Sequence, residues 1–156
     1  MKYSITHNLE HINLLKNEAK KIVFTNGCFD LLHVGHIRYL SKAKELGDYL
    51  IVGLNSDKSV KNLKGKNRPI NIFEDRAKLL MALTSVDMVL VFEEQTPKNL
   101  IQEILPDILV KGGDYKIEDI VGSNTVIKNG GNVKVLQFHE GYSSSCLLYT
   151  SPSPRD

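Results

Sequence analysis

The chain has 156 residues, which is enough for one domain with a normal hydrophobic core. A formal net charge of +2, no tryptophan and 7% aromatic residues give neither the basic surface nor the stacking platform typical of nucleic-acid binding. No apolar run approaches the roughly 20 residues that cross a membrane, the N-terminus lacks a signal-peptide pattern, and Cys28 and Cys146 are too few for a disulfide framework. We therefore expect a cytoplasmic protein that binds neither membranes nor nucleic acid.

Predicted helices and strands alternate along the chain. A polar amphipathic helix is predicted within residues 1–20, and short apolar runs predict strands at 22–24, 49–54, 87–92, 107–110 and 133–138. Helical patterns lie between them at 34–46, 74–85, 97–105 and 117–128, with Thr96 as the N-cap before Pro97, whereas the basic segment 58–68 is predicted to be a loop. Five strands separated by helices predict an α/β, Rossmann-like fold, in which a five-stranded parallel sheet carries helices on both faces.

An anion-binding pattern follows the first predicted strand. His33 and His36 are three residues apart at the start of a helix, so their side chains fall on one face. Gly35 between them leaves room for a ligand, and a helix N-terminus presents free backbone N–H groups. Asp30 is the only acidic residue close by, so no complete set of metal ligands is apparent. The pattern favours a polyphosphate site over a metal site.

At these residues the sequence resembles a known family. The residues 27–30, GCFD, followed by HVGH at 33–36, resemble the signature of the nucleotidyltransferases related to cytidylyltransferases, whose fold carries an H-x-G-H motif. Within that superfamily the chain is most similar to the adenylyltransferase domain of the ADP-heptose synthases. The resemblance includes NSD at 55–57, LKG and RPIN at 63–71, EDR at 74–76, FEE and TP between 92 and 97, LVKGGDY at 109–115 and EGYSS at 140–144. It implies a nucleotidyltransferase domain at 21–148, preceded by the helix within 1–20.

The resemblance also implies roles for individual residues. His33, His36 and Lys64 are expected to be catalytic, with Lys61 and Lys66 as competitors for the role of Lys64. Expected nucleotide-binding residues lie in three loops: Thr25, Asn26, Gly27, Cys28, Phe29, Asp30 and Gly35; Lys111, Gly112, Gly113 and Asp114; and Tyr142, Ser143, Ser144 and Ser145. Asn55, Asp57, Arg68 and Arg76 are tentative substrate-binding residues, although an ion pair could equally make Arg76 structural. Asp30 could instead act only at the helix start.

The implied reaction transfers AMP from ATP, with Mg²⁺ carried by ATP and pyrophosphate, to D-glycero-β-D-manno-heptose 1-phosphate. Alternatives are a CTP-dependent transfer to glycerol 3-phosphate or another small phosphate, and a nucleotide-binding module without turnover. A homodimer and a separate heptose kinase of the same pathway are further expected partners. Pro152 and Pro154 cannot continue a helix, so residues 149–156 are predicted to be a disordered tail outside the family domain.

Overall fold

The computed structural model describes residues 1–137 and contains one parallel sheet. Its strands lie in the order β3-β2-β1-β4-β5, and every neighbouring pair is parallel. They are β1 (Ile22–Gly27), β2 (Tyr49–Asn55), β3 (Met88–Phe92), β4 (Ile108–Gly112) and β5 (Asn132–Leu136). This confirms the predicted five-stranded α/β fold. The predicted end of the last strand, Phe138, lies outside the described residues.

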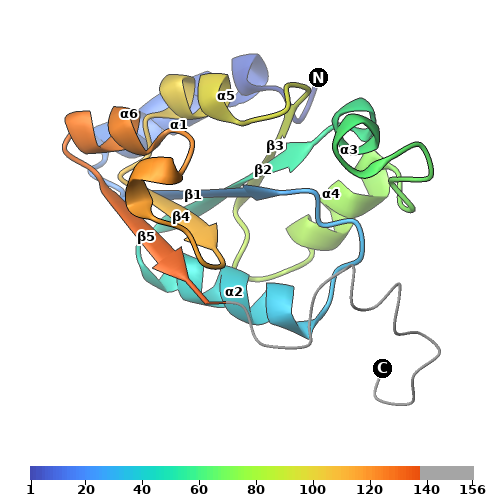
Figure 1. Ribbon diagram of the computed structural model, residues 1–156. Helices are drawn as coiled ribbons and strands as arrows, with labels where there is room; N and C mark the ends of the chain where they lie inside the picture. The colour runs from blue at the N-terminus through green and yellow to red at the C-terminus, as the bar shows by residue number, and fades with distance from the viewer. Residues whose placement is uncertain (138–156) are drawn as a thin grey trace.

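Helices cover both faces of this sheet, as Figure 1 shows. On one face lie α1 (Ile5–Asn17), α5 (Lys98–Ile104) and α6 (Ser123–Lys128), and on the other lie α2 (Val34–Glu45) and α4 (Phe73–Met81). The short helices α3 (Asp57–Lys64) and η1 (Ile117–Asp119) follow β2 and β4. No helix within residues 1–137 is long and apolar enough to span a bilayer.

Two apolar cores hold the layers together, one on each face of the sheet. Phe24 and Ile51 point to the α1, α5 and α6 side, whereas their strand neighbours Val23 and Val52 point to the α2 and α4 side. This alternation follows from the period of two in a β-strand. Six of the seven residues of β2 are buried, which confirms that this central strand is covered on both faces.

The basic segment after β2 differs from the sequence prediction, because its first part is a helix and not a loop. The Ser56 hydroxyl accepts a hydrogen bond from the Ser59 N–H at 3.1 Å and so caps α3, while Val60 is fully buried beneath it. Gly65, with a φ of +108°, ends the helix directly after Lys64. Lys58, Lys61 and Lys64 are therefore held on a helix, of which Lys64 is the last residue, whereas Lys66 follows the helix.

Three other predicted helix boundaries also shift. The predicted helix at 117–128 is divided into η1 and α6, because Gly122 takes a φ of +87° and packs against Ile101, where a Cβ would lie 2.7 Å from a methyl carbon. Pro97, not Thr96, occupies the N-cap of α5. The helix predicted to reach residue 85 ends at Met81.

Candidate active site

The candidate site lies where the strand order reverses. From β1 the chain continues outward through β2 and β3, and later it returns to the other side of β1 to form β4 and β5. In open parallel sheets, ligands bind at the carboxyl ends of the strands beside such a reversal. The loop between β1 and α2 and the end of β4 meet at this point, and both were predicted to bind nucleotide.

The two histidines form a stacked pair at the N-terminus of α2. His33 is the N-cap residue and His36 is the third helical residue, with their ring centroids 3.7 Å apart. The His33 backbone N–H donates to Nδ1 of His36 at 3.3 Å, and the rings of Phe29 and His36 pack in a T-shaped arrangement with their centroids 5.1 Å apart. Because Nδ1 of His36 accepts this bond, its neutral ring carries the proton on Nε2 and can donate from that nitrogen.

Both imidazoles are neutral at neutral pH in the protein without ligand. Burial, the neighbouring His33 and the charge of Lys64 together lower the pKa of His36 to about 4. Burial also lowers the pKa of His33 from its ordinary value. The pair therefore offers neutral N–H donors to an anion, with positive charge supplied by lysine side chains nearby.

A hollow of about 220 Å³ opens beside His36, and we call it the histidine hollow. It is lined by residues of the β1–α2 loop, α2, α3 and the end of β4: Asn26, Gly27, Cys28, Phe29, His36, Tyr39, Lys64, Lys111, Gly112 and Tyr115. The structure thus brings Lys64 to the predicted phosphate site, whereas Lys58, Lys61 and Lys66 are not among the residues that line the hollow. Burial lowers the pKa of Lys111, opposed in part by Cys28.

Other predicted nucleotide residues lie around this hollow without lining it. Thr25 is fully buried, and its hydroxyl is 2.6 Å from the Tyr39 hydroxyl below the loop. Gly35 is buried in the first turn of α2. Gly113 bonds through its N–H to Leu136 O at 3.0 Å, and Asp114 is exposed. Tyr142 and Ser143 to Ser145 lie outside the described residues, as does the predicted tail.

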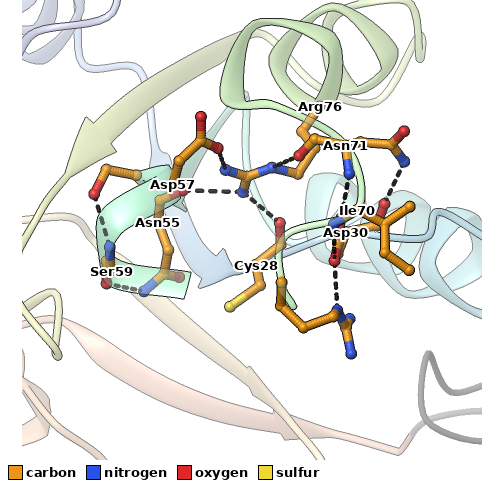
Figure 2. A network of polar contacts seen from close by, with 10 residues as sticks. Cys28, Asp30, Asn55, Asp57, Ser59, Ile70, Asn71 and Arg76 are labelled. Carbon is orange, nitrogen blue, oxygen red and sulfur yellow. Dashed lines mark hydrogen bonds and ion pairs between the residues drawn. The ribbon is translucent and has the colours of Figure 1, made fainter. Parts of the chain in front are cut away.

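Asp30 fastens the β1–α2 loop to the segment before α4. Its fully buried carboxylate accepts bonds from Arg68 Nε at 2.7 Å and from the backbone N–H groups of Ile70 and Asn71 at 2.9–3.0 Å, as Figure 2 shows for the labelled residues. Burial alone would raise the pKa of Asp30, but these hydrogen bonds and the Arg68 charge lower it overall. The carboxylate is therefore committed to holding two loops together. Nη2 of Arg68 is buried but has no hydrogen-bond partner among residues 1–137.

Arg76 ties together three loops at the strand ends. Nε donates to Asn71 O at 2.9 Å, Nη1 donates to Cys28 O at 2.8 Å and to Asn55 O at 2.9 Å, and Nη2 pairs with Asp57 at 2.7 Å (Figure 2). Its side chain has no exposed surface. Asn55 donates from its side chain to Ser59 Oγ. The buried Arg76 and Asn55, with the partly exposed Asp57, thus form a scaffold behind the site.

Sequence reasoning missed several residues of this region. Tyr39 lies one helical turn after His36, so the helical period could have indicated it. Ile70 and Asn71 act through backbone groups, which leave no side-chain signal. Cys28, predicted to bind nucleotide, lines the histidine hollow. Burial raises the pKa of its thiol, partly offset by Lys64, Arg76 and Arg68, so the thiol stays protonated at neutral pH.

Comparisons with known proteins agree with this geometry. The sequence profile described as cytidylyltransferase-like matches residues 24–147. The chain is 60% identical over 133 residues to the bifunctional protein HldE of Haemophilus ducreyi and 55% identical over 139 residues to that of Psychromonas ingrahamii. These matches cover 85% and 89% of this chain, but the chain spans only 28% and 29% of those relatives.

Two solved structures share the fold. A lipopolysaccharide core biosynthesis protein from Thermoplasma volcanium superposes with a TM-score of 0.62 at 31% identity, covering 80% of this chain and 99% of that one. A pantoate-beta-alanine ligase from Francisella tularensis, at 18% identity, gives a TM-score of 0.56 over 88% of this chain and 67% of that one. The second likeness concerns the fold alone.

Proposed function

The chain belongs to the cytidylyltransferase-like family of nucleotidyltransferases, and we propose that it transfers AMP from ATP to D-glycero-β-D-manno-heptose 1-phosphate, giving ADP-heptose and pyrophosphate. The observation that carries this proposal is the convergence of His36, Lys64 and Lys111 on one hollow, with His33 stacked beside it. Neutral imidazoles, two ammonium groups and a glycine-lined backbone suit the oxygens of a triphosphate.

In the proposed reaction an oxygen of the sugar phosphate attacks the α-phosphorus of ATP. The bond from that phosphorus to the bridging oxygen breaks, and pyrophosphate leaves with the electron pair. The acceptor phosphate is already ionised at neutral pH, so no proton has to be removed from it. Such a transfer needs alignment of the reacting groups and neutralisation of the charge on the phosphate oxygens. We assign these tasks to His33, His36 and Lys64. The rings of His33 and His36 are stacked and held at the start of α2 before the substrate binds, which is the condition for electrostatic stabilisation of the transition state.

The nucleotide is proposed to lie along residues 25–30 and the end of β4. Gly27 and Gly112 line the histidine hollow and let phosphate or ribose approach the backbone. Gly35 would do the same at the helix N-terminus, whereas Gly113 and Asp114 are proposed to contact the base. Tyr142 and Ser143 to Ser145 keep their proposed role at the β and γ phosphates, as an expectation from the family resemblance.

Of the four tentative substrate residues, we retain Arg68 as a direct contact. Asp30 fixes its guanidinium through Nε, while Nη2 is buried and has no partner among the described residues, so a phosphate oxygen could satisfy it. Arg76 has no exposed surface and at least four hydrogen bonds within the chain. We therefore propose that Arg76, Asn55 and Asp57 position the loops and do not touch the substrate.

Mg²⁺ is proposed to enter as part of the substrate MgATP. Within residues 1–137, no group of three His, Cys, Asp or Glu side chains is placed to hold an ion. Triphosphate oxygens are the hard ligands that Mg²⁺ prefers, and this ion commonly keeps several waters. The described residues fit an ion that the nucleotide brings, with Lys64 and the histidines sharing the phosphate charge.

Pyrophosphate release from a panel of nucleotides and acceptors tests the proposal. ATP with the heptose 1-phosphate should turn over far better than CTP with glycerol 3-phosphate, and the reverse order would reject the heptose assignment. The absence of turnover with every pair, despite ATP binding, would instead indicate a nucleotide-binding module. Because the proposed reaction consumes a sugar 1-phosphate, a heptose kinase remains the proposed pathway partner, and the homodimer remains a prediction.

A further inference from the structure

A second hollow, of about 240 Å³, lies on the other side of the same strand ends. It shares Asn26, Lys111 and Tyr115 with the histidine hollow. Asn26 and Lys111 lie two residues beyond the paired Phe24 and Leu109, so they extend side by side from β1 and β4. The carboxyl ends of β1 and β4 therefore lie between two hollows that share these three lining residues. One is bounded by α2 and α3, and the other by the β3–α5 loop and the segment around η1.

The second hollow has a different chemical lining from the first. Its polar groups are the amides of Asn26 and Gln95, the Thr96 hydroxyl and the Asp119 carboxylate, and Pro97, Ile120 and Val121 provide the apolar part of its wall. A carboxylate repels phosphate groups but accepts hydrogen bonds from hydroxyls, and amides both donate and accept. Such a mixed set, with the Tyr115 ring at its margin, suits a polyhydroxylated molecule that also has apolar C–H surface.

Lys111 is the one cationic side chain among the described residues that line both hollows. Its Nζ lies 5.3 Å from the centroid of the Tyr115 ring, and the side chain is partly buried. An ammonium group at this junction can contact a phosphate that faces the histidine hollow while the rest of the ligand occupies the second one. The predicted nucleotide residues Gly27, Cys28, Phe29 and Gly112 line only the histidine hollow.

We propose that the second hollow binds the polyol part of the acceptor, so that Gln95, Thr96 and Asp119 hold sugar hydroxyls, while Lys111, which lines both hollows, contacts the acceptor phosphate as well as the triphosphate. The proposal rests on the transferase function proposed above and adds to it the place of the sugar. In this arrangement the acceptor phosphate and the α-phosphate of ATP meet at the strand ends of β1 and β4, which is the geometry that direct transfer requires.

The test compares KM for the sugar 1-phosphate with KM for ATP in variants of the second hollow. Asp119→Asn should raise KM for heptose 1-phosphate about 10-fold or more, and Gln95→Ala and Thr96→Val about 3- to 10-fold each, as expected for lost hydrogen bonds to charged and neutral groups. KM for ATP should stay within about twofold of wild type. Glu118→Gln and Gln102→Ala are matched controls, because both residues line a neighbouring surface hollow and not this one.

A bulky substitution provides a second test that does not depend on single hydrogen bonds. Val121→Trp should fill the hollow, abolish calorimetric binding of heptose 1-phosphate and leave ATP binding intact, with a thermal melt to confirm folding. If these variants weaken ATP and spare the sugar, the hollow holds adenosine and the proposal is wrong. Unchanged KM for both substrates would also overturn it. If the wild type uses glycerol 3-phosphate instead of the heptose, the proposed function fails. The hollow proposal then depends on whether the same variants raise KM for that polyol phosphate.

Discussion

Replacing Arg76 with methionine should destabilise the domain without directly removing a substrate contact. The change leaves three backbone carbonyls, those of Cys28, Asn55 and Asn71, without their charged donor. Each unsatisfied buried acceptor costs about 1–3 kcal/mol, although relaxation and water recover part of this. The Asp57 side chain is 46% exposed, so its carboxylate regains water and its ion pair contributes little.

We therefore expect Arg76→Met to lower the free energy of unfolding by about 3 kcal/mol, within the range for breaking a buried charged network. In a chain of this size such a loss lowers Tm by roughly 6–12 °C. Urea denaturation with matched thermal melts would measure it. Lys78→Met is the control, because Lys78 is a basic residue on the same helix, is exposed, and should change stability by less than about 0.5 kcal/mol.

The structural role of Arg76 would be refuted by the opposite pattern. If Arg76→Met kept its free energy of unfolding within about 1 kcal/mol of wild type while KM for the sugar phosphate rose strongly, Arg76 would be a substrate-binding residue. The tentative assignment from sequence would then be correct, and the buried scaffold would be less important than its hydrogen bonds indicate.

Four further predictions concern the histidine hollow and its loops. His36→Ala should lower kcat on the order of 10²–10³-fold with little change in KM for ATP, and a variant that keeps more than about a tenth of wild-type kcat would contradict the electrostatic role. The pKa of His36 is about 4 in the folded protein, against an ordinary value of 6.5, so its contribution to stability is complete above pH 6.5 and is lost as pH falls towards 4. In urea titrations, the free energy of unfolding should therefore fall less between pH 7 and pH 4.5 in His36→Asn than in wild type. Lys64→Ala should weaken ATP binding and slow transfer in steady-state assays, whereas Lys58→Ala, at an exposed position outside the hollow, should do neither; equal effects would reject the assignment of Lys64. Asp30→Asn should lower the free energy of unfolding by about 3 kcal/mol, because in either amide orientation the new nitrogen faces a donor, Arg68 Nε or the Asn71 N–H. A near-neutral effect in urea denaturation would show that these bonds contribute little.

The local sequence was sufficient to predict the unit formed by β1, the following loop and α2. Its signals are short-range: an apolar run, a glycine break, and histidines three residues apart at a helix start. The alternation of apolar runs with helical periods likewise determined the parallel sheet, because each element buries a face with its own period. The family motif added the expected chemistry at the same residues.

Only the tertiary structure decided which residues act together around that unit. Arg76 binds residues 5 to 48 positions away in the chain, and no periodic pattern marks such partners. The family resemblance had already named Lys64, but its position beside the histidine hollow depends on a serine cap and a buried valine that turn an expected loop into α3. The second hollow unites Asn26 from β1, Gln95 from the β3–α5 loop and Asp119 from η1. Local sequence determines secondary structure through short-range periodicity and capping. These sites depend instead on long-range packing, because the strand ends that form them come together only when the chain has folded.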